Sequence, residues 1–228
     1  MTRTLKQPAA PAAKLTDISN DCFAAMQSKM SLAMTTAYHS EEMAAIRRIL
    51  GDITESDGGI EHLVAIGSGD LRYLDVAHDF RKSYTAIEPS LATELAANEI
   101  AELRDRFDIG IVAKKLEDVT QDDLPQGRRL FFFLFNVFPY IPDALELQKS
   151  LVRPGDIVVV SGWNNDSFEA RRLQDIYYEH LGREFKCDLA ASVTNGYIDG
   201  VEKQAQQFAS TASRVKGRTT DILTLKVK

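Results

Sequence analysis

The sequence predicts an α/β fold: a mainly parallel sheet with helices on both faces. From residue 59 onward, short apolar runs alternate with helical stretches of about ten to fifteen residues, which is typical of βαβ units. Several of these runs are continuously apolar. Continuous rather than alternating apolar residues indicate parallel strands that are buried on both faces.

The first 58 residues predict a helical cap rather than part of the sheet. Residues 1–14 are rich in Ala and Pro and lack the apolar core of a signal peptide, so we expect a disordered lead-in there. Within residues 15–58, an apolar stripe through Met26 and Met30 predicts one helix. Ser40, followed by two glutamates, predicts the start of a second helix. The α/β domain then occupies residues 59–228.

The elements of this domain follow from the same patterns. Strands are expected at 62–66, 83–87, 108–113, 130–134, 156–161 and 220–227, the last one antiparallel, and helices at 71–80, 91–107, 142–151 and 167–181. The segment 187–217 is poorly periodic. It either holds a further strand or forms an insertion that shapes the substrate pocket, with Tyr197 as a candidate contact.

Composition narrows the possible partners. The chain has 228 residues and a formal net charge of −6, which argues against binding to a nucleic-acid backbone. Its longest apolar run, residues 130–135, is far too short to span a membrane. Cys22 and Cys187 are far apart, and no spacing is typical of a metal site. We expect a cytoplasmic monomer or homodimer that acts on a small molecule, without a metal, nucleic acid or membrane.

A glycine-rich turn is the strongest chemical signal. The strand at 62–66 runs into Gly67, Ser68, Gly69 and Asp70 before a helix begins. Glycines permit a tight turn and close backbone approach to a ligand, and the helix start offers free N–H groups. A turn without any ligand remains the alternative.

An acidic residue strengthens this signal. Glu88, followed by Pro89, ends the next strand about twenty residues later, where a carboxylate can accept hydrogen bonds from ribose hydroxyls. Alternatively, Glu88 caps the helix that begins near Ser90. Arg72 stands where a dinucleotide fingerprint has its third glycine, which favours a nucleoside without phosphates.

On these motifs the chain resembles the class I S-adenosylmethionine-dependent methyltransferases. The turn VAIGSGDL (64–71) is similar to the family's first motif, and Glu88 matches its ribose-binding acid. LFNVFPYIPD (134–143) resembles the segment that lines the reaction site, and VRPGDIVVVS (152–161) resembles the turn into the fifth strand. The resemblance implies a Rossmann-like, seven-stranded sheet with an N-terminal helical cap, and S-adenosylmethionine as cofactor.

The sequence departs from the family at two positions. Ala65 stands where the family usually has an acidic residue, and Leu71 where it usually has a third glycine. The form IGSGDL also resembles nicotianamine synthase-like enzymes, which transfer the aminobutanoyl arm of the same cofactor.

Three functions stay open at this stage. The first is methyl transfer to a small molecule. The second is attack at the γ-carbon of the cofactor's amino-acid arm, which releases methylthioadenosine. That attack would either close the arm to azetidine-2-carboxylate or transfer it to an amine. The third is a non-catalytic nucleoside-binding module, which Ala65 favours.

Several side chains are candidates for the reaction site. Phe138, Tyr140 and Trp163 follow the fourth and fifth strands, where aromatic faces would attract a sulfonium. Tyr38, from the cap, would close the pocket; packing between the cap helices is its alternative role.

Two polar residues and one apolar residue complete the candidates for the site. The Asn136 amide would bond the cofactor or the nucleophile, or form a turn. His39 would act as a general base, although a histidine in a polar turn is often merely exposed. Leu116 would contact the adenine edge, by analogy with the family.

Overall fold

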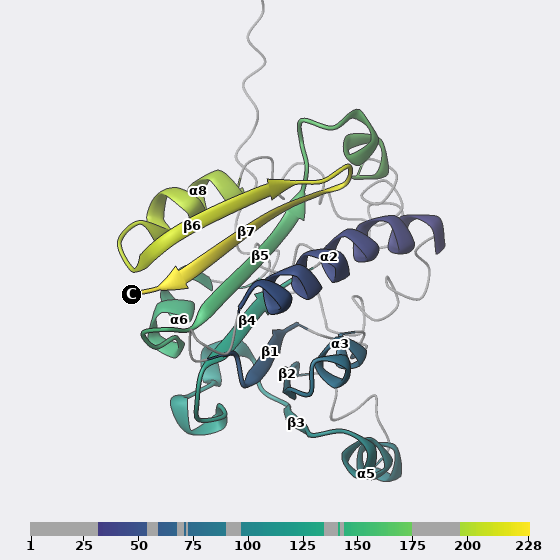
Figure 1. Ribbon diagram of the computed structural model, residues 1–228, viewed down its shortest axis with the longest axis vertical. Coiled ribbons are helices and arrows are strands. Elements are labelled where there is room, and N and C mark those ends of the chain that lie inside the picture. The colour runs from purple at the N-terminus through teal and green to yellow at the C-terminus, as the bar shows by residue number, and fades with distance from the viewer. Residues whose placement is uncertain are drawn as a thin grey trace, which may run out of the picture.

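A seven-stranded sheet forms the centre of the molecule (Figure 1). The structure is a computed structural model that describes residues 32–53, 59–67, 71, 73–89, 97–134, 141, 144–174 and 197–228. The strands are β1 (His62–Ile66), β2 (Ser83–Ile87), β3 (Ile109–Val112), β4 (Arg129–Phe133), β5 (Ile157–Trp163), β6 (Ala209–Lys216) and β7 (Thr220–Val227). This confirms the predicted α/β class and the six predicted strands.

The strand order is β3-β2-β1-β4-β5-β7-β6. Strands β1 to β5 are parallel, whereas β7 pairs antiparallel with both β5 and β6. The late antiparallel strand is thus confirmed beside β5. The seventh strand, β6, lies inside the segment 187–217, as one of its two interpretations required.

Helices cover both faces of the sheet. They are α2 (Leu32–Asp52), α3 (Leu74–Asp79), α5 (Ala97–Arg106), α6 (Ala144–Leu151) and α8 (Tyr197–Ala205), with 3-10 turns η3 (Leu116–Asp118) and η4 (Gln121–Asp123). Residues 168–174 are also helical. The helix predicted at 71–80 is shorter than expected and begins at Leu74. Of the described helices, none is long and apolar enough to cross a membrane.

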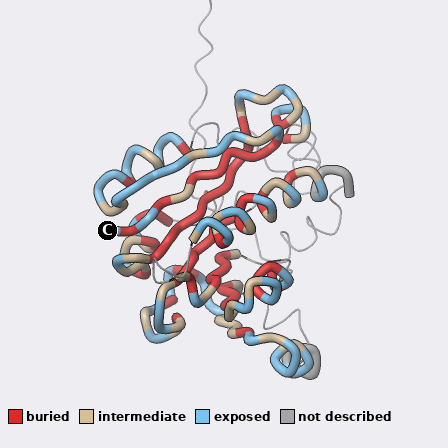
Figure 2. The backbone as a smooth tube through the Cα atoms, in the orientation of Figure 1, coloured by how far each residue is buried: buried red, intermediate tan, exposed pale blue. Residues whose placement is uncertain are grey.

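Alternate residues of the inner strands enter two separate cores, because successive side chains of a strand point to opposite faces. Phe132 packs with α2 and α3 on one face, whereas Phe131 and Phe133 pack with α6 and α8 on the other. The central strands are therefore buried along their length, while β6 at the sheet edge is largely exposed (Figure 2). This two-sided burial explains the continuously apolar strand sequences.

The predicted helix start at Ser40 is wrong. A single helix, α2, runs from Leu32 to Asp52, and Ser40 lies within it. The Ser40 hydroxyl donates to the Ala37 carbonyl (3.0 Å) instead of capping a helix. Glu41 and Glu42 therefore do not lie in the first turn of a helix. They make the tertiary contacts that are described below. Residues 1–31, which hold the first predicted cap helix, lie outside the described residues.

A buried ion pair holds the amino edge of the sheet. Arg129, at the start of β4, donates two side-chain hydrogen bonds to Asp156, just before β5, at 2.6 and 3.1 Å. Asp156 also accepts from the backbone N–H groups of Arg129 and Arg153. Both side chains are almost fully buried, so each satisfies a charge that water cannot reach.

Candidate active site

The candidate site lies at the carboxyl edge of the parallel strands. Strands β1, β2 and β3 follow one another toward one side of the sheet, whereas β4 and β5 lie on the other side of β1. The direction in which successive strands are added to the sheet therefore reverses, and the point of reversal lies between the neighbouring strands β1 and β4. Open α/β sheets bind their ligands in the crevice outside such a switch point.

Gly67 and Glu88 meet at this edge. Gly67 has a φ of +67°, a left-handed conformation that starts the turn after β1. Its N–H donates to the Ile87 carbonyl (2.9 Å), so the turn begins beside the end of β2. Glu88 is the next residue, half-buried, and its own N–H donates to Val112 at the end of β3. Pro89 follows in a turn.

Leu71 also has a left-handed backbone, with a φ of +54°. It is the position where the resembled family has a glycine. Its side chain packs against the core beneath α2 and α3. The departure from the motif therefore keeps the backbone shape and adds apolar contact.

Helix α2 brings Tyr38 onto β5. The Tyr38 and Trp163 rings meet edge to face, with centroids 4.7 Å apart, and both side chains are buried. Trp163 is the last residue of β5, so the pair lies at the carboxyl edge. The structure thus brings together two aromatic residues that were proposed separately for the site.

A hydrogen-bonded cluster lies beside this aromatic pair. Glu42, which is fully buried, accepts from the hydroxyls of Tyr73 and Ser161, one at each carboxylate oxygen. His39 Nδ1 lies 3.1 Å from Glu42 Oε2 and 3.2 Å from the Tyr73 hydroxyl. The cluster joins α2 to β5 and to the residue that precedes α3. We call these four residues, His39, Glu42, Tyr73 and Ser161, the Glu42 cluster.

The expected environment of His39 is therefore corrected. It lies inside α2, not in a polar turn, and its side chain is only 15% exposed. The other three members of the Glu42 cluster were not predicted. A glutamate after a serine suggests a helix start, and only its position four residues after Tyr38, on the same helix face, connects it with the site.

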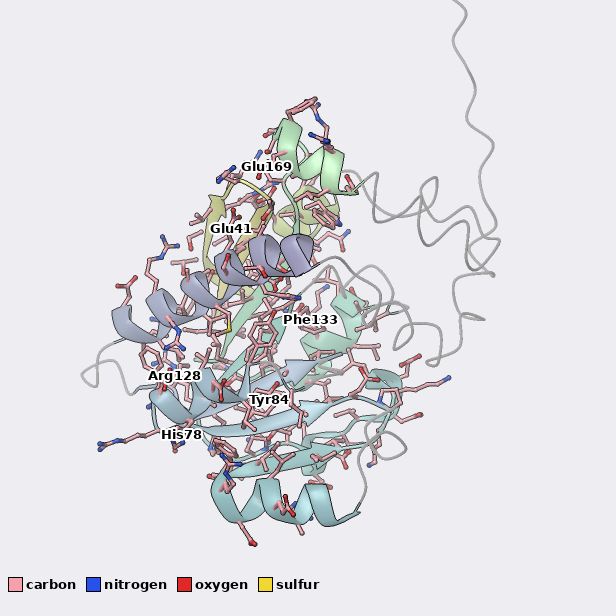
Figure 3. The ribbon with its side chains drawn as sticks, turned by 90° about the vertical axis from the view of Figure 1, so that its right-hand side faces the viewer. Glu41, His78, Tyr84, Arg128, Phe133 and Glu169 are labelled. Atoms are coloured by element: carbon pink, nitrogen blue, oxygen red, sulfur yellow. The ribbon has the colours of Figure 1, made fainter. Side chains whose placement is uncertain are left out.

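A second glutamate of α2 holds the β6–β7 turn. Glu41 accepts hydrogen bonds from the N–H groups of Arg218, Thr219 and Thr220 and from the Thr220 hydroxyl, at 2.7 to 3.2 Å. Figure 3 labels Glu41 where α2 meets this hairpin. Partial burial raises the pKa of Glu41, but the hydrogen bonds from Thr220 and Thr219 outweigh it, and the net pKa is lowered.

Leu116 lies in η3, soon after β3, and is buried in the core beneath α6 and α8. Its contact with adenine stays a prediction. The candidates Ser68, Gly69, Asp70, Asn136, Phe138 and Tyr140 lie outside the described residues, as does the side chain of Tyr197. Within the described part of the chain, no group of three or more His, Cys, Asp and Glu side chains is placed to hold a metal ion.

Comparison with known proteins supports the fold. No protein-family model and no curated protein matches the sequence. Among solved structures, the chain is similar to a Burkholderia thailandensis 1,6-didemethyltoxoflavin-N1-methyltransferase bound to S-adenosylhomocysteine, with a TM-score of 0.51, 16% identity and coverage of 98% of this chain and 93% of that one. It is also similar to the N-methyltransferase NodS from Bradyrhizobium japonicum, with a TM-score of 0.51, 9% identity and coverage of 91% and 99%.

Some similar structures are longer than this chain. An O-methyltransferase family protein from Burkholderia thailandensis matches with a TM-score of 0.52 and 10% identity over 81% of this chain, but the match spans only 56% of that protein. The match to the methyltransferase SibL spans 61% of that chain. At these identities the similarity concerns architecture alone. The chain has the fold of the class I S-adenosylmethionine-dependent methyltransferases.

Proposed function

We propose that the protein binds S-adenosylmethionine at the carboxyl edge of β1 and β2 and transfers its methyl group to a small molecule. The observation that carries this proposal is the adjacency of Gly67 and Glu88, fixed by the hydrogen bond from Gly67 to Ile87. This hydrogen bond holds the left-handed glycine turn beside the strand end that precedes Glu88, at the switch point of the sheet.

The chemistry of these two residues fits a nucleoside. The Glu88 carboxylate would accept hydrogen bonds from ribose hydroxyls, while the turn at Gly67 would let the backbone approach the rest of the ligand. Ser68, Gly69 and Asp70 would continue that turn, and Pro89 would follow the ribose contact. Similar structures that hold S-adenosylhomocysteine, such as the toxoflavin methyltransferase and NodS, support S-adenosylmethionine as the nucleoside.

The aromatic pair suits a sulfonium cofactor. A positive sulfur near the faces of Tyr38 or Trp163 would gain about 0.5–2 kcal/mol from each ring. Phe138, Tyr140 and Asn136, which follow β4 in sequence, would complete this part of the pocket. We propose a small-molecule acceptor and a monomer or homodimer that needs no metal, nucleic acid or membrane, since the net charge of −6 disfavours an anionic surface as partner.

Calorimetry with S-adenosylhomocysteine tests the binding site. Glu88→Gln should weaken binding by about 1–3 kcal/mol, because a charged hydrogen-bond acceptor is lost. Glu102→Gln is the matched control, since Glu102 is exposed on α5, far from the β1 turn in sequence and facing solvent. Equal affinities of wild type and Glu88→Gln would refute the ribose assignment.

Mass spectrometry tests the reaction. Incubated with S-adenosylmethionine alone, the protein should leave the cofactor intact above the no-enzyme background, because methyl transfer needs an acceptor. When the protein and S-adenosylmethionine are incubated with each of a panel of small hydroxyl and amine compounds, an accepted compound should yield S-adenosylhomocysteine and a methylated product. Methylthioadenosine with azetidine-2-carboxylate, or with an aminobutanoyl amine, would replace methyl transfer by attack at the γ-carbon. Binding without any turnover would identify a nucleoside-binding module.

A further inference from the structure

We infer that Glu41 is a positioning residue of the candidate site: by binding the β6–β7 turn, it holds the Tyr38–Trp163 aromatic pair in place. The inference rests on the proposed function, since it treats this pair as part of the cofactor site. It adds the β6–β7 turn, which is far from the glycine-rich motif in sequence, to the frame of that site. Glu41 acts through the aromatic pair and not on the ligand.

Helix α2 contacts the β5–β7 strand pair at two points one helical turn apart. Tyr38 packs edge to face on Trp163, and Glu41, three residues after Tyr38, binds the start of β7. Residues three apart are neighbours on the surface of a helix. The two contacts are therefore adjacent, and the position of one constrains the position of the other.

The two residues that α2 contacts are direct partners in the sheet. Trp163, the last residue of β5, pairs with Thr220, the first residue of β7. Together with Tyr38 and Glu41 they form a closed circuit of a helical turn, an aromatic contact, a strand pairing and a hydrogen bond. Loss of the Glu41 contact should therefore let the Tyr38 ring move relative to Trp163.

The β6–β7 turn is also fixed to the residue that follows Trp163. The Asn164 N–H donates to the Thr219 carbonyl (2.9 Å), and the Asn164 side-chain amide donates to the Gly217 carbonyl (2.6 Å). Three consecutive N–H groups of the same turn donate to Glu41. The turn thus connects the end of β5 with α2.

The contact requires a carboxylate at position 41. Both oxygens of Glu41 accept hydrogen bonds from the turn. A glutamine has one oxygen and one NH₂ group, and the NH₂ group can only donate. Glu41→Gln would therefore set a donor against the N–H groups of the turn, with little change in the size of the side chain.

Gly217 leaves room for this carboxylate. A Cβ at position 217 would collide with Glu41 Oε2, although the backbone of Gly217 is not left-handed and would accept an alanine. Gly217→Ala should therefore displace the Glu41 carboxylate while its charge is kept. This gives a second variant that breaks the same contact from the side of the turn.

Tryptophan fluorescence of the ligand-free protein tests the positioning role. Trp163 is the only tryptophan of the chain, and it is buried, so the emission reports on the aromatic pair alone. Glu41→Gln and Gly217→Ala should shift this emission to longer wavelength and increase its quenching by acrylamide, because a displaced Tyr38 exposes the indole to water. Unchanged emission in both folded variants would overturn the inference. If Glu41→Gln does not fold, Gly217→Ala decides.

Glu169→Gln is the matched control. Glu169 binds the side chain of Arg218 in the same turn, at 2.6 and 3.0 Å, but it lies in the helical segment after β5 and not in α2 (Figure 3). Its loss should leave the Trp163 emission unchanged. A shift equal to that of Glu41→Gln would show a general loosening of the turn, which would overturn the role of Glu41.

Calorimetry with S-adenosylhomocysteine connects the contact to the site. Glu41→Gln should weaken binding by about two- to thirtyfold, the range for residues that act on a site without touching its ligand, whereas Glu169→Gln should leave the affinity unchanged. Equal affinities of wild type and Glu41→Gln would overturn the inference and leave the proposed function intact. Failure of the wild type to bind would refute the proposed function itself.

Discussion

At the scale of single residues, Leu71 shows how a motif can be altered without changing its backbone. A left-handed backbone costs a residue with a Cβ about 1–2 kcal/mol, and Leu71, at a φ of +54°, bears this cost. Its side chain offsets the cost by packing against the core beneath α2 and α3. The side chain and the backbone therefore act in opposite directions at this position.

Two substitutions separate these effects. Leu71→Ala loses the packing and keeps the unfavourable backbone, whereas Leu71→Gly loses the packing but relieves the backbone. We expect the glycine variant to have the higher free energy of unfolding, by about 1 kcal/mol. At Val76, a buried residue inside helix α3, the order of the alanine and glycine variants should reverse by about the same amount, since glycine destabilises a helix interior relative to alanine. Urea unfolding of the four variants measures both differences. Alanine more stable than glycine at position 71 would contradict the prediction.

At the scale of elements, α2 holds the β6–β7 hairpin through Glu41. The hydrogen bonds from the turn stabilise the ionised carboxylate, and the pKa of Glu41 lies below its ordinary value of 4.5. A folded-state pKa below the unfolded one adds stability at pH values above the unfolded pKa, and this stability is lost as the pH falls through the folded pKa. Gly217 suits this contact, because a Cβ at that position would collide with the Glu41 carboxylate.

Glu41→Gln should therefore destabilise the protein in a pH-dependent manner. We expect a loss of about 1 kcal/mol near pH 7, a modest value because the contact is partly exposed to solvent. The difference from wild type should shrink as the pH falls below about 4.5. Urea unfolding between pH 7 and pH 3.5 checks this, with Glu102→Gln on the exposed face of α5 as control. A difference that stays constant down to pH 3.5 would show that charge on Glu41 is not involved.

The same two elements show how far sequence patterns reach. Buried parallel strands such as β4, with the sequence RLFFF, are evident because both of their faces require apolar residues. Strand β6, ASTASRVK, is exposed on most of its length and is held by pairing with β7, so its sequence has no strand period to detect. Helix α2 was divided in two because Ser40 has a capping side chain, whose hydroxyl bonds within the helix instead.

The candidate site was predictable only where a local motif encodes it. Gly67 and Glu88 lie at strand ends, and the parallel pairing of β1 with β2 makes them neighbours. The Glu42 cluster was not predictable, because it joins residues 39, 42, 73 and 161 through the packing of α2 on β5. No spacing within the sequence brings such distant positions together.

At the scale of the whole molecule, we expect the two edges of the sheet to have separate tasks. The amino edge contains the buried Arg129–Asp156 pair, and the carboxyl edge contains Gly67 and Glu88. Arg129 is the first residue of β4, and Asp156 directly precedes β5. Ligands of such sheets bind at the other end of the strands, beyond their carboxyl ends. Stability and cofactor affinity should therefore respond to different substitutions.

Asp156→Asn and Glu88→Gln test this separation as a pair. Asp156→Asn leaves the Arg129 charge buried without its partner, which should cost about 3–5 kcal/mol of unfolding free energy. The affinity for S-adenosylhomocysteine should stay within twofold, measured by calorimetry at a temperature where the variant is folded. Glu88→Gln should change the unfolding free energy of the ligand-free protein by less than about 0.5 kcal/mol, since Glu88 is only half-buried, yet weaken the ligand. If Asp156→Asn also weakened the ligand, the two edges would be energetically coupled through the strands, and the carboxyl edge could not be treated as an independent site.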